Sequence, residues 1–149
     1  MQLTSYSLAK ALEDLIAASG VFDAAEVYVG LYQTWTNQGL NTTMADIVPA
    51  TGSVSNLVQV TDWSPVYLAK SGLEVVDAQT MVWSPTTPAD AQTVQGVYLT
   101  DASPAGNLLG VIPFAANVSL AGPTSRLSVV VRLTLDPTGT WDATVTWDD

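Results

Sequence analysis

Histidine and cysteine are both absent from this sequence of 149 residues. Histidine is the usual general base near neutral pH and the most common metal ligand. Its absence excludes Ser-His-Asp and Cys-His catalytic systems and histidine-based zinc or iron sites, and the absence of cysteine excludes disulfides, thiol nucleophiles and cysteine zinc sites. The glycine motifs of nucleotide-binding proteins and the G-x-S-x-G motif of serine hydrolases are missing as well. We therefore expect a non-enzymatic protein with no catalytic residue, no metal ligand and no cofactor.

Basic residues are scarce: Lys10, Lys70, Arg126 and Arg132 stand against 14 acidic residues, which gives a net charge of −10. Proteins that bind nucleic acids need lysine and arginine to displace counterions from the phosphates. We therefore expect no nucleic-acid partner, and anionic membrane surfaces are disfavoured for the same reason. No apolar run approaches the roughly 20 residues of a membrane-spanning helix, and the first residues lack the basic and apolar regions of a signal peptide.

Charged residues of either sign make up only 12% of the sequence, about half of the usual share in a soluble domain. Ionised groups are the most costly groups to bury, so a surface this poor in charge favours contact with protein partners. A lineage that prefers Ser, Thr and Ala explains the same composition equally well.

Carboxylates leave one catalytic route open, the acid pair of glycoside hydrolases. Most acids, however, lie beside turn residues or on the polar side of expected strands, which favours solvated turn acids: Asp23, Glu26, Asp46, Asp62, Asp77, Asp101 and Asp142. Oxygen ligands also allow a structural calcium ion, although no EF-hand loop occurs. Its candidate ligands are Asp101 with Asn107, or Asp142 with Asp148 and Asp149.

The N-terminal region carries a helical pattern. Leu8, Leu12, Leu15 and Ile16 fall on one face of a helix over about residues 5–18. The rest of the chain has β character. Expected strands are 27–32, 56–60, 79–83, 94–100 and 107–114, with 63–68 as a strand or an extended loop and 44–47 as a helical turn capped by Thr42 or Thr43.

The clearest strand pattern is C-terminal. Apolar residues alternate along 127–135, residues 136–139 fit a type I turn, and 141–147 alternate again, which predicts a hairpin with one buried and one solvated face. We therefore expect one domain over 1–149, with a β body over about 27–147. Its predicted fold is mainly β: an antiparallel sandwich or barrel with one N-terminal amphipathic α-helix.

Exposed tryptophans can stack on a sugar or a protein partner. Trp141 and Trp147 share the apolar face of the hairpin, so we expect them in the core. Trp63 and Trp83 each precede Ser-Pro and are expected to anchor strand ends, whereas Trp35 lies in a polar stretch, 34–43, that predicts a loop. The candidate interface or ligand-contact residues are Trp35, Trp63 and Tyr67.

Several short segments occur in a recognisable order after the N-terminal helix: 27–32, 42–46, Trp63, Trp83, 96–101, 106–109, Phe114 and 127–135. Over about residues 1–135 this layout resembles small virion proteins of tailed bacteriophages, of the head-decoration (cement) or tail-associated type. The resemblance implies a structural role without catalysis, a homo-oligomer with a trimer favoured, and the major capsid protein or other virion proteins as partners. It also implies synthesis in the host cytoplasm and a place on the outer surface of the phage head rather than the tail.

Three functional hypotheses follow. The first is a decoration protein that binds and stabilises the assembled capsid shell. The second is a tail-tip or fibre-associated adhesion protein with a glycan site at Trp35. The third, more remote, is a carboxylate-dependent glycosidase.

Overall fold

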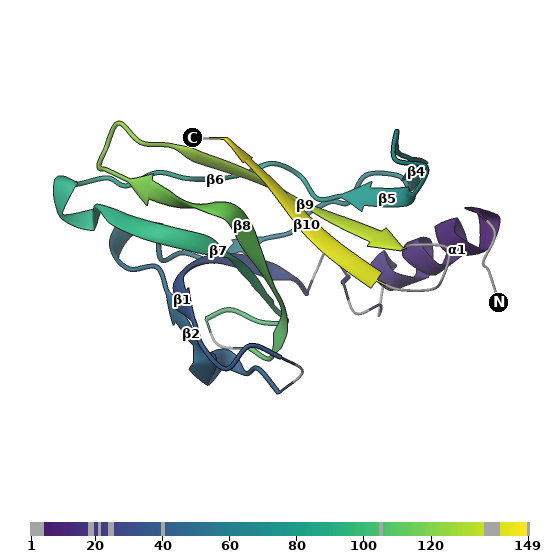
Figure 1. The fold of residues 1–149 in the computed structure, drawn as a ribbon, viewed down its shortest axis with the longest axis horizontal. Coiled ribbons are helices and arrows are strands. Elements are labelled where there is room, and N and C mark those ends of the chain that lie inside the picture. The colour runs from purple at the N-terminus through teal and green to yellow at the C-terminus, as the bar shows by residue number, and fades with distance from the viewer. Residues whose placement is uncertain are drawn as a thin grey trace.

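Strands dominate the part of the chain that the computed structural model describes, which is residues 5–17, 20, 22–23, 26–39, 41–104, 106–135 and 141–148. Within these residues ten strands form two five-stranded antiparallel sheets, and one α-helix precedes them (Figure 1). The expected mainly β fold with one N-terminal helix is confirmed. None of the described helices has the length and hydrophobicity needed to cross a membrane.

The first sheet has the order β2-β1-β7-β8, and β3 also pairs with β1. Its strands are β1 (Tyr28–Trp35), β2 (Ile47–Pro49), β3 (Val58–Gln59), β7 (Gln92–Thr100) and β8 (Leu108–Leu120). The second sheet has the order β10-β9-β5-β4, and β6 also pairs with β9. Its strands are β4 (Tyr67–Leu68), β5 (Glu74–Asp77), β6 (Met81–Trp83), β9 (Leu127–Leu135) and β10 (Trp141–Asp148). Three 3-10 turns complete the described elements: η1 (Met44–Asp46), η2 (Gly52–Val54) and η3 (Pro88–Asp90).

A shared core joins the two sheets. Alternate residues of β9 are almost fully buried, as the alternation along 127–135 predicts. They pack in one cluster with Val29 and Leu31 of β1 and Val97 of β7. Because the two sheets pack face to face on this core and form separate ladders, the fold is a sandwich rather than a closed barrel.

Helix α1 (Ser5–Ile16) packs against β5 and β9 of the second sheet. Leu12 is completely buried in the shared core, with Leu15 and Ile16 packed against it. The apolar stripe of the helix therefore faces the sandwich, as its spacing predicts. The helix ends at Ile16, two residues before the predicted end.

The outer face of the first sheet is also buried at its centre, through two glycine–tyrosine pairs. Gly30 lies opposite Tyr98 and Gly96 opposite Tyr32 in the β1–β7 ladder. Each glycine lacks the Cβ that would collide with the ring of the facing tyrosine, so both rings lie over the sheet backbone. Tyr32, Tyr98 and Ile47 form a second buried cluster there.

Candidate functional site

Strand β4 forms an open edge of the second sheet. Among the described residues its one partner strand is β5, with Tyr67 opposite Val75 and Leu68 opposite Glu74. The Ala69 N–H donates to the Leu73 carbonyl at 2.9 Å and continues this ladder. Hydrogen-bonded pairs alternate along an antiparallel ladder, so the N–H and C=O of Leu68 point away from β5. The outer edge of β4 can therefore pair with another extended chain.

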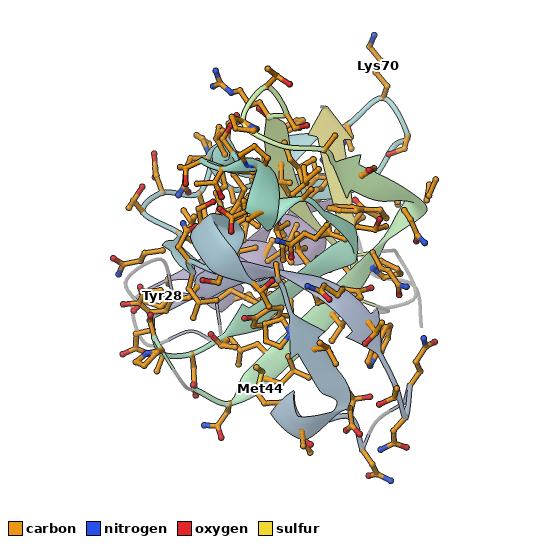
Figure 2. The ribbon with its side chains drawn as sticks, turned by 90° about the vertical axis from the view of Figure 1, so that its left-hand side faces the viewer. Tyr28, Met44 and Lys70 are labelled. Carbon is orange, nitrogen blue, oxygen red and sulfur yellow. The ribbon has the colours of Figure 1, made fainter. Side chains whose placement is uncertain are left out.

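The side chains on this edge are apolar and exposed. Leu68 is 61% exposed and Tyr67 40% exposed, and they are two of the four large hydrophobic residues exposed in the described part of the chain. They line a shallow pocket of about 380 Å³ together with Ala69, Lys70, Ser71 and Arg132. Lys70 stands on a loop that projects from the body of the molecule (Figure 2). Two of the four basic residues in the sequence thus border one apolar edge.

A hydrogen-bonded triad fixes the inner wall of this pocket. Arg132 lies directly opposite Asp77 in the β5–β9 ladder. Its Nε donates to Asp77 Oδ1 at 2.7 Å and its Nη2 to Asp77 Oδ2 at 3.0 Å, a bidentate pair. The Tyr67 hydroxyl donates to Asp77 Oδ2 at 2.6 Å and accepts from Arg132 Nη2 at 2.8 Å. The guanidinium carbon lies 5.9 Å from the centroid of the Tyr67 ring.

The triad shifts the titration of all three groups. Burial raises the pKa of the Asp77 carboxyl, but hydrogen bonds from Arg132 and Tyr67 outweigh it and hold the pKa below its usual value. The hydrogen bond to Asp77 raises the pKa of Tyr67, and the same carboxylate raises the pKa of Arg132. Asp77 is therefore ionised at neutral pH and holds both neighbours in place. The sequence pattern selected Tyr67 but not Asp77 or Arg132. The one signal that could have indicated them was Arg132 itself, a single charged residue on the polar face of the strand predicted over 127–135.

Trp35 does not lie in a polar loop, and that prediction is wrong. It is the last residue of β1, paired with Ile47 of β2, and its ring is partly buried. The ring stands edge-on to Tyr32, with centroids 6.4 Å apart and planes at 76°. The strand continues to this point because its last residues pair with β2 and the tryptophan packs on the Tyr32 cluster.

A shallow groove nevertheless borders Trp35. One part, of about 320 Å³, lies between Trp35 and residues 108–111 at the start of β8. A second part, of about 390 Å³, is lined by residues 42–45 and 106–108, so the two share Thr42 and Leu108. The Trp35 indole Nε1 is buried and has no hydrogen-bond partner among the described residues. Met44, on the wall of this groove, and Lys70 lie far apart in Figure 2, so the groove is separate from the β4 edge.

Trp63 is largely buried. It is only 8% exposed, and its indole Nε1 donates to the Phe22 carbonyl at 2.7 Å. Trp83 is 1% exposed and donates in the same way to the Asn56 carbonyl at 3.0 Å. Trp83 ends β6, as expected of a tryptophan before Ser-Pro, whereas Trp63 forms an isolated bridge with Ala78 and does not end a strand. The burial of Trp63 leaves little of its ring exposed for the predicted contact. The side chains of Trp141 and Trp147 lie outside the described residues.

Several carboxylates accept hydrogen bonds that fix turns and loops. A hydrogen bond from the Thr43 backbone lowers the pKa of Asp46, and one from the Ser53 hydroxyl lowers that of Asp90. The Asn107 side chain and backbone donate to Asp101 at 2.8 and 2.7 Å and lower its pKa. A general acid needs a raised pKa, so these shifts have the opposite sign. Asp101 and Asn107 bind each other, and in the described residues no three metal-ligating side chains gather at one place.

Comparison with known proteins gives no match: no protein-family model, curated protein or solved structure is significantly similar to this chain.

Proposed function

We propose that this chain is a non-enzymatic structural protein of a tailed-phage virion, of the head-decoration type, which binds the assembled capsid shell through the edge of β4. The observation that carries the proposal is the exposed, unpaired edge at Leu68, with Tyr67 and two basic residues beside it. An open strand edge can pair with another extended chain, and the exposed Leu68 on this edge adds apolar surface that such a chain would cover.

The chemistry around this edge supports binding rather than catalysis. The carboxylate of the triad has a lowered pKa, which is the opposite of what a general acid needs. The Leu12-containing core and the flanking sheets hold the edge on a rigid scaffold. A subunit that binds only the assembled shell stabilises the shell by mass action, by about 2.7 kcal/mol per site at a free concentration one hundred times its Kd.

The test compares particles with and without the protein. Particles that lack it should lose their contents at lower temperature and lower salt than complete particles, and the wild-type chain added back should restore them. Leu68→Asp should fail to restore stability, whereas Val82→Asp should succeed, because Val82 is an exposed apolar residue of β6 outside the β4 edge. Equal stability of the two kinds of particle would refute the proposal.

A second candidate is a tail-tip or fibre adhesion protein, and the groove at Trp35 favours it. An aromatic ring beside Thr42, with Asn107 farther along the same groove, suits a neutral saccharide. Immunogold labelling at the tail together with glycan-array binding that Trp35→Ala abolishes would support this function. Labelling only on the head, with no glycan bound, would exclude it.

A further inference from the structure

We propose that the β4 edge accepts an extended acidic segment of a partner protein as an additional strand, with one carboxylate of that segment bound between Lys70 and Arg132. The inference deepens the proposed function, because it uses the same edge and specifies the chemistry of the partner.

The backbone of β4 is suited to strand addition. Leu68 directs an N–H and a C=O outward, and addition of a strand to such an edge is a common mode of peptide recognition. Strand β2, an edge of the first sheet, offers a contrast. Its Ile47 N–H already donates to the Met44 carbonyl, and Pro49 has no N–H. The edge of β2 is therefore poor in donors, whereas that of β4 is not.

The charges at the pocket select an acidic partner. The bonds of Arg132 to Asp77 and Tyr67 use Nε and Nη2, so Nη1 is left for a ligand. Lys70 is exposed on the same pocket, and its charge is not balanced by the triad. Surface charges act over roughly 8–10 Å in physiological salt. The chain as a whole, with its net charge of −10, repels an acidic segment. Such a segment is therefore attracted only where it comes close to Lys70 and Arg132.

The side chains of β4 also set the pattern of the partner. Successive strand residues point to opposite faces, and Tyr67 lies on the face of Arg132, to which it is bonded. A partner residue on that face meets the guanidinium, whereas its neighbours on the other face meet Leu68. Lys70 lies in the turn after β4 and lines the same pocket. Alternating acidic and apolar residues fit this arrangement, because the carboxylates reach the cations and the apolar side chains cover Leu68.

The test uses a peptide of this pattern, acetyl-Val-Glu-Val-Glu-Val-Glu-Val-amide, titrated into the ¹⁵N-labelled full chain in low salt. We expect saturable shifts of the backbone amides from Leu68 to Gly72. The same peptide with glutamine in place of glutamate should bind at least about tenfold more weakly, equivalent to about 1.4 kcal/mol. Shifts confined to other residues, equal binding of the glutamine peptide, or no binding at millimolar peptide would overturn the inference.

Matched charge variants sharpen the test. Lys70→Glu should weaken peptide binding at least tenfold, whereas Arg126→Glu, at an exposed residue outside the pocket, makes the same change in net charge and should leave binding intact. Melting temperatures of both variants should match the wild type. Equal loss in both variants would mean that net charge alone is responsible and would overturn the inference.

Preferential binding of a thymidine oligonucleotide at these amides would make the pocket a phosphate site, and a concentration-dependent shift without peptide would assign the edge to a second copy; either result also overturns the inference.

The two proposals can fail separately. If Leu68→Asp abolishes restoration of particles but the peptide does not bind, the edge binds its partner by other chemistry and only this inference fails. If the peptide binds as expected but the protein makes no difference to particles, the acidic-strand site stands and the virion function fails.

Discussion

Replacing Gly30 with alanine tests how tightly the outer face of the first sheet is packed. A Cβ at this position would lie 2.7 Å from Tyr98 Cζ and 2.6 Å from Leu57 Cδ2, well inside the roughly 3.5–4.0 Å of a favourable carbon–carbon contact. Tyr98 is only 4% exposed, so its ring has little room to move. We predict that Gly30→Ala lowers the free energy of unfolding by about 1–3 kcal/mol through overpacking, although alanine is otherwise favoured over glycine in a strand by about 0.5–1 kcal/mol.

Two further glycines provide the controls. A Cβ on Gly110 of β8 meets nothing within 4 Å, so Gly110→Ala should leave stability unchanged or raise it by up to about 1 kcal/mol. A Cβ on Gly96 would collide with the Ile112 carbonyl oxygen and lie 2.8 Å from the Pro113 Cα, which are backbone atoms of β8. Backbone cannot move aside as a side chain can, so Gly96→Ala should cost at least as much as Gly30→Ala.

A double-mutant cycle separates the two kinds of collision. Tyr98→Leu removes the ring that Gly30→Ala would strike, so the double variant should recover about 0.5–3 kcal/mol relative to the sum of the single changes. Tyr32→Leu should not rescue Gly96→Ala to the same extent, because the backbone collision remains.

Urea unfolding followed by circular dichroism measures these effects. A change of about 2 kcal/mol moves the midpoint by about 1 M at an m-value near 2 kcal/mol/M. The m-value should stay constant across the series. Equal midpoints for Gly30→Ala and Gly110→Ala, or strict additivity of Gly30→Ala and Tyr98→Leu, would refute the reasoning.

Trp35→Phe removes a buried N–H that has no partner, whereas Trp83→Phe removes one that is hydrogen-bonded. Trp35→Phe should therefore lower the free energy of unfolding by about 1–2 kcal/mol less than Trp83→Phe in urea titrations. Equal losses would show that the Trp35 N–H does have a hydrogen-bond partner. The lowered pKa of Asp77 means that the unfolded chain binds this proton more readily, so the stability that Arg132 and Tyr67 provide through it is complete above about pH 4 and is lost as the pH falls toward the folded pKa. Asp77→Asn should reduce the fall in melting temperature on acidification below about pH 4, and an unchanged fall would show that the carboxylate is not involved. Leu12→Ala should cost about 2–5 kcal/mol, and a loss below about 1 kcal/mol would mean that α1 does not complete the core.

Local patterns predicted the elements whose signals are complete in one segment. The strand predicted over 127–135 coincides with β9, because one of its faces is buried from Leu127 to Leu133 and the alternation is therefore visible. The turn η1 occurs at Met44–Asp46, where Thr43 and Asp46 form a capping box. These features need no information from distant residues.

Tertiary contacts decided the remaining boundaries. Strand β8 runs on to Leu120, past the predicted end at residue 114, although it contains Pro113. Pro113 lies opposite Gly96, where the β7–β8 register shifts, so the missing N–H is tolerated there. Within 63–68 only the last two residues form a strand, and Trp63 adds an isolated bridge to Ala78. Strand β5, with three of its four residues buried, was not separated from the strand predicted at 79–83. The predicted turn at 136–139 lies outside the described residues.

The candidate site was predicted only in part for a similar reason. Tyr67 was selected as an exposed aromatic residue, and it is exposed. Asp77 and Arg132 are 55 residues apart, and the sheet register alone brings them together. Trp35 and Trp63 were selected for their side-chain type, but burial depends on the strands that cover them, and no local signal reports it.

The triad joins β5 to β9 and also fixes the orientation of Arg132. Surface ion pairs stabilise a fold by about 0–1 kcal/mol, and the partly buried, bidentate pair of Arg132 with Asp77 belongs to the favourable end of that range. Its geometric effect is larger, because the bidentate bond and the Tyr67 hydroxyl hold a long side chain in one orientation beside an open strand edge. Ordering such a side chain on binding costs about 0.5–1.5 kcal/mol, and here that order is present before a partner arrives. Asp46 and Asp101 use their hydrogen bonds to hold their own loops, and Asp90 joins η3 to η2. Asp77 uses its bonds to position the cation and the ring that border a pocket lined by β4.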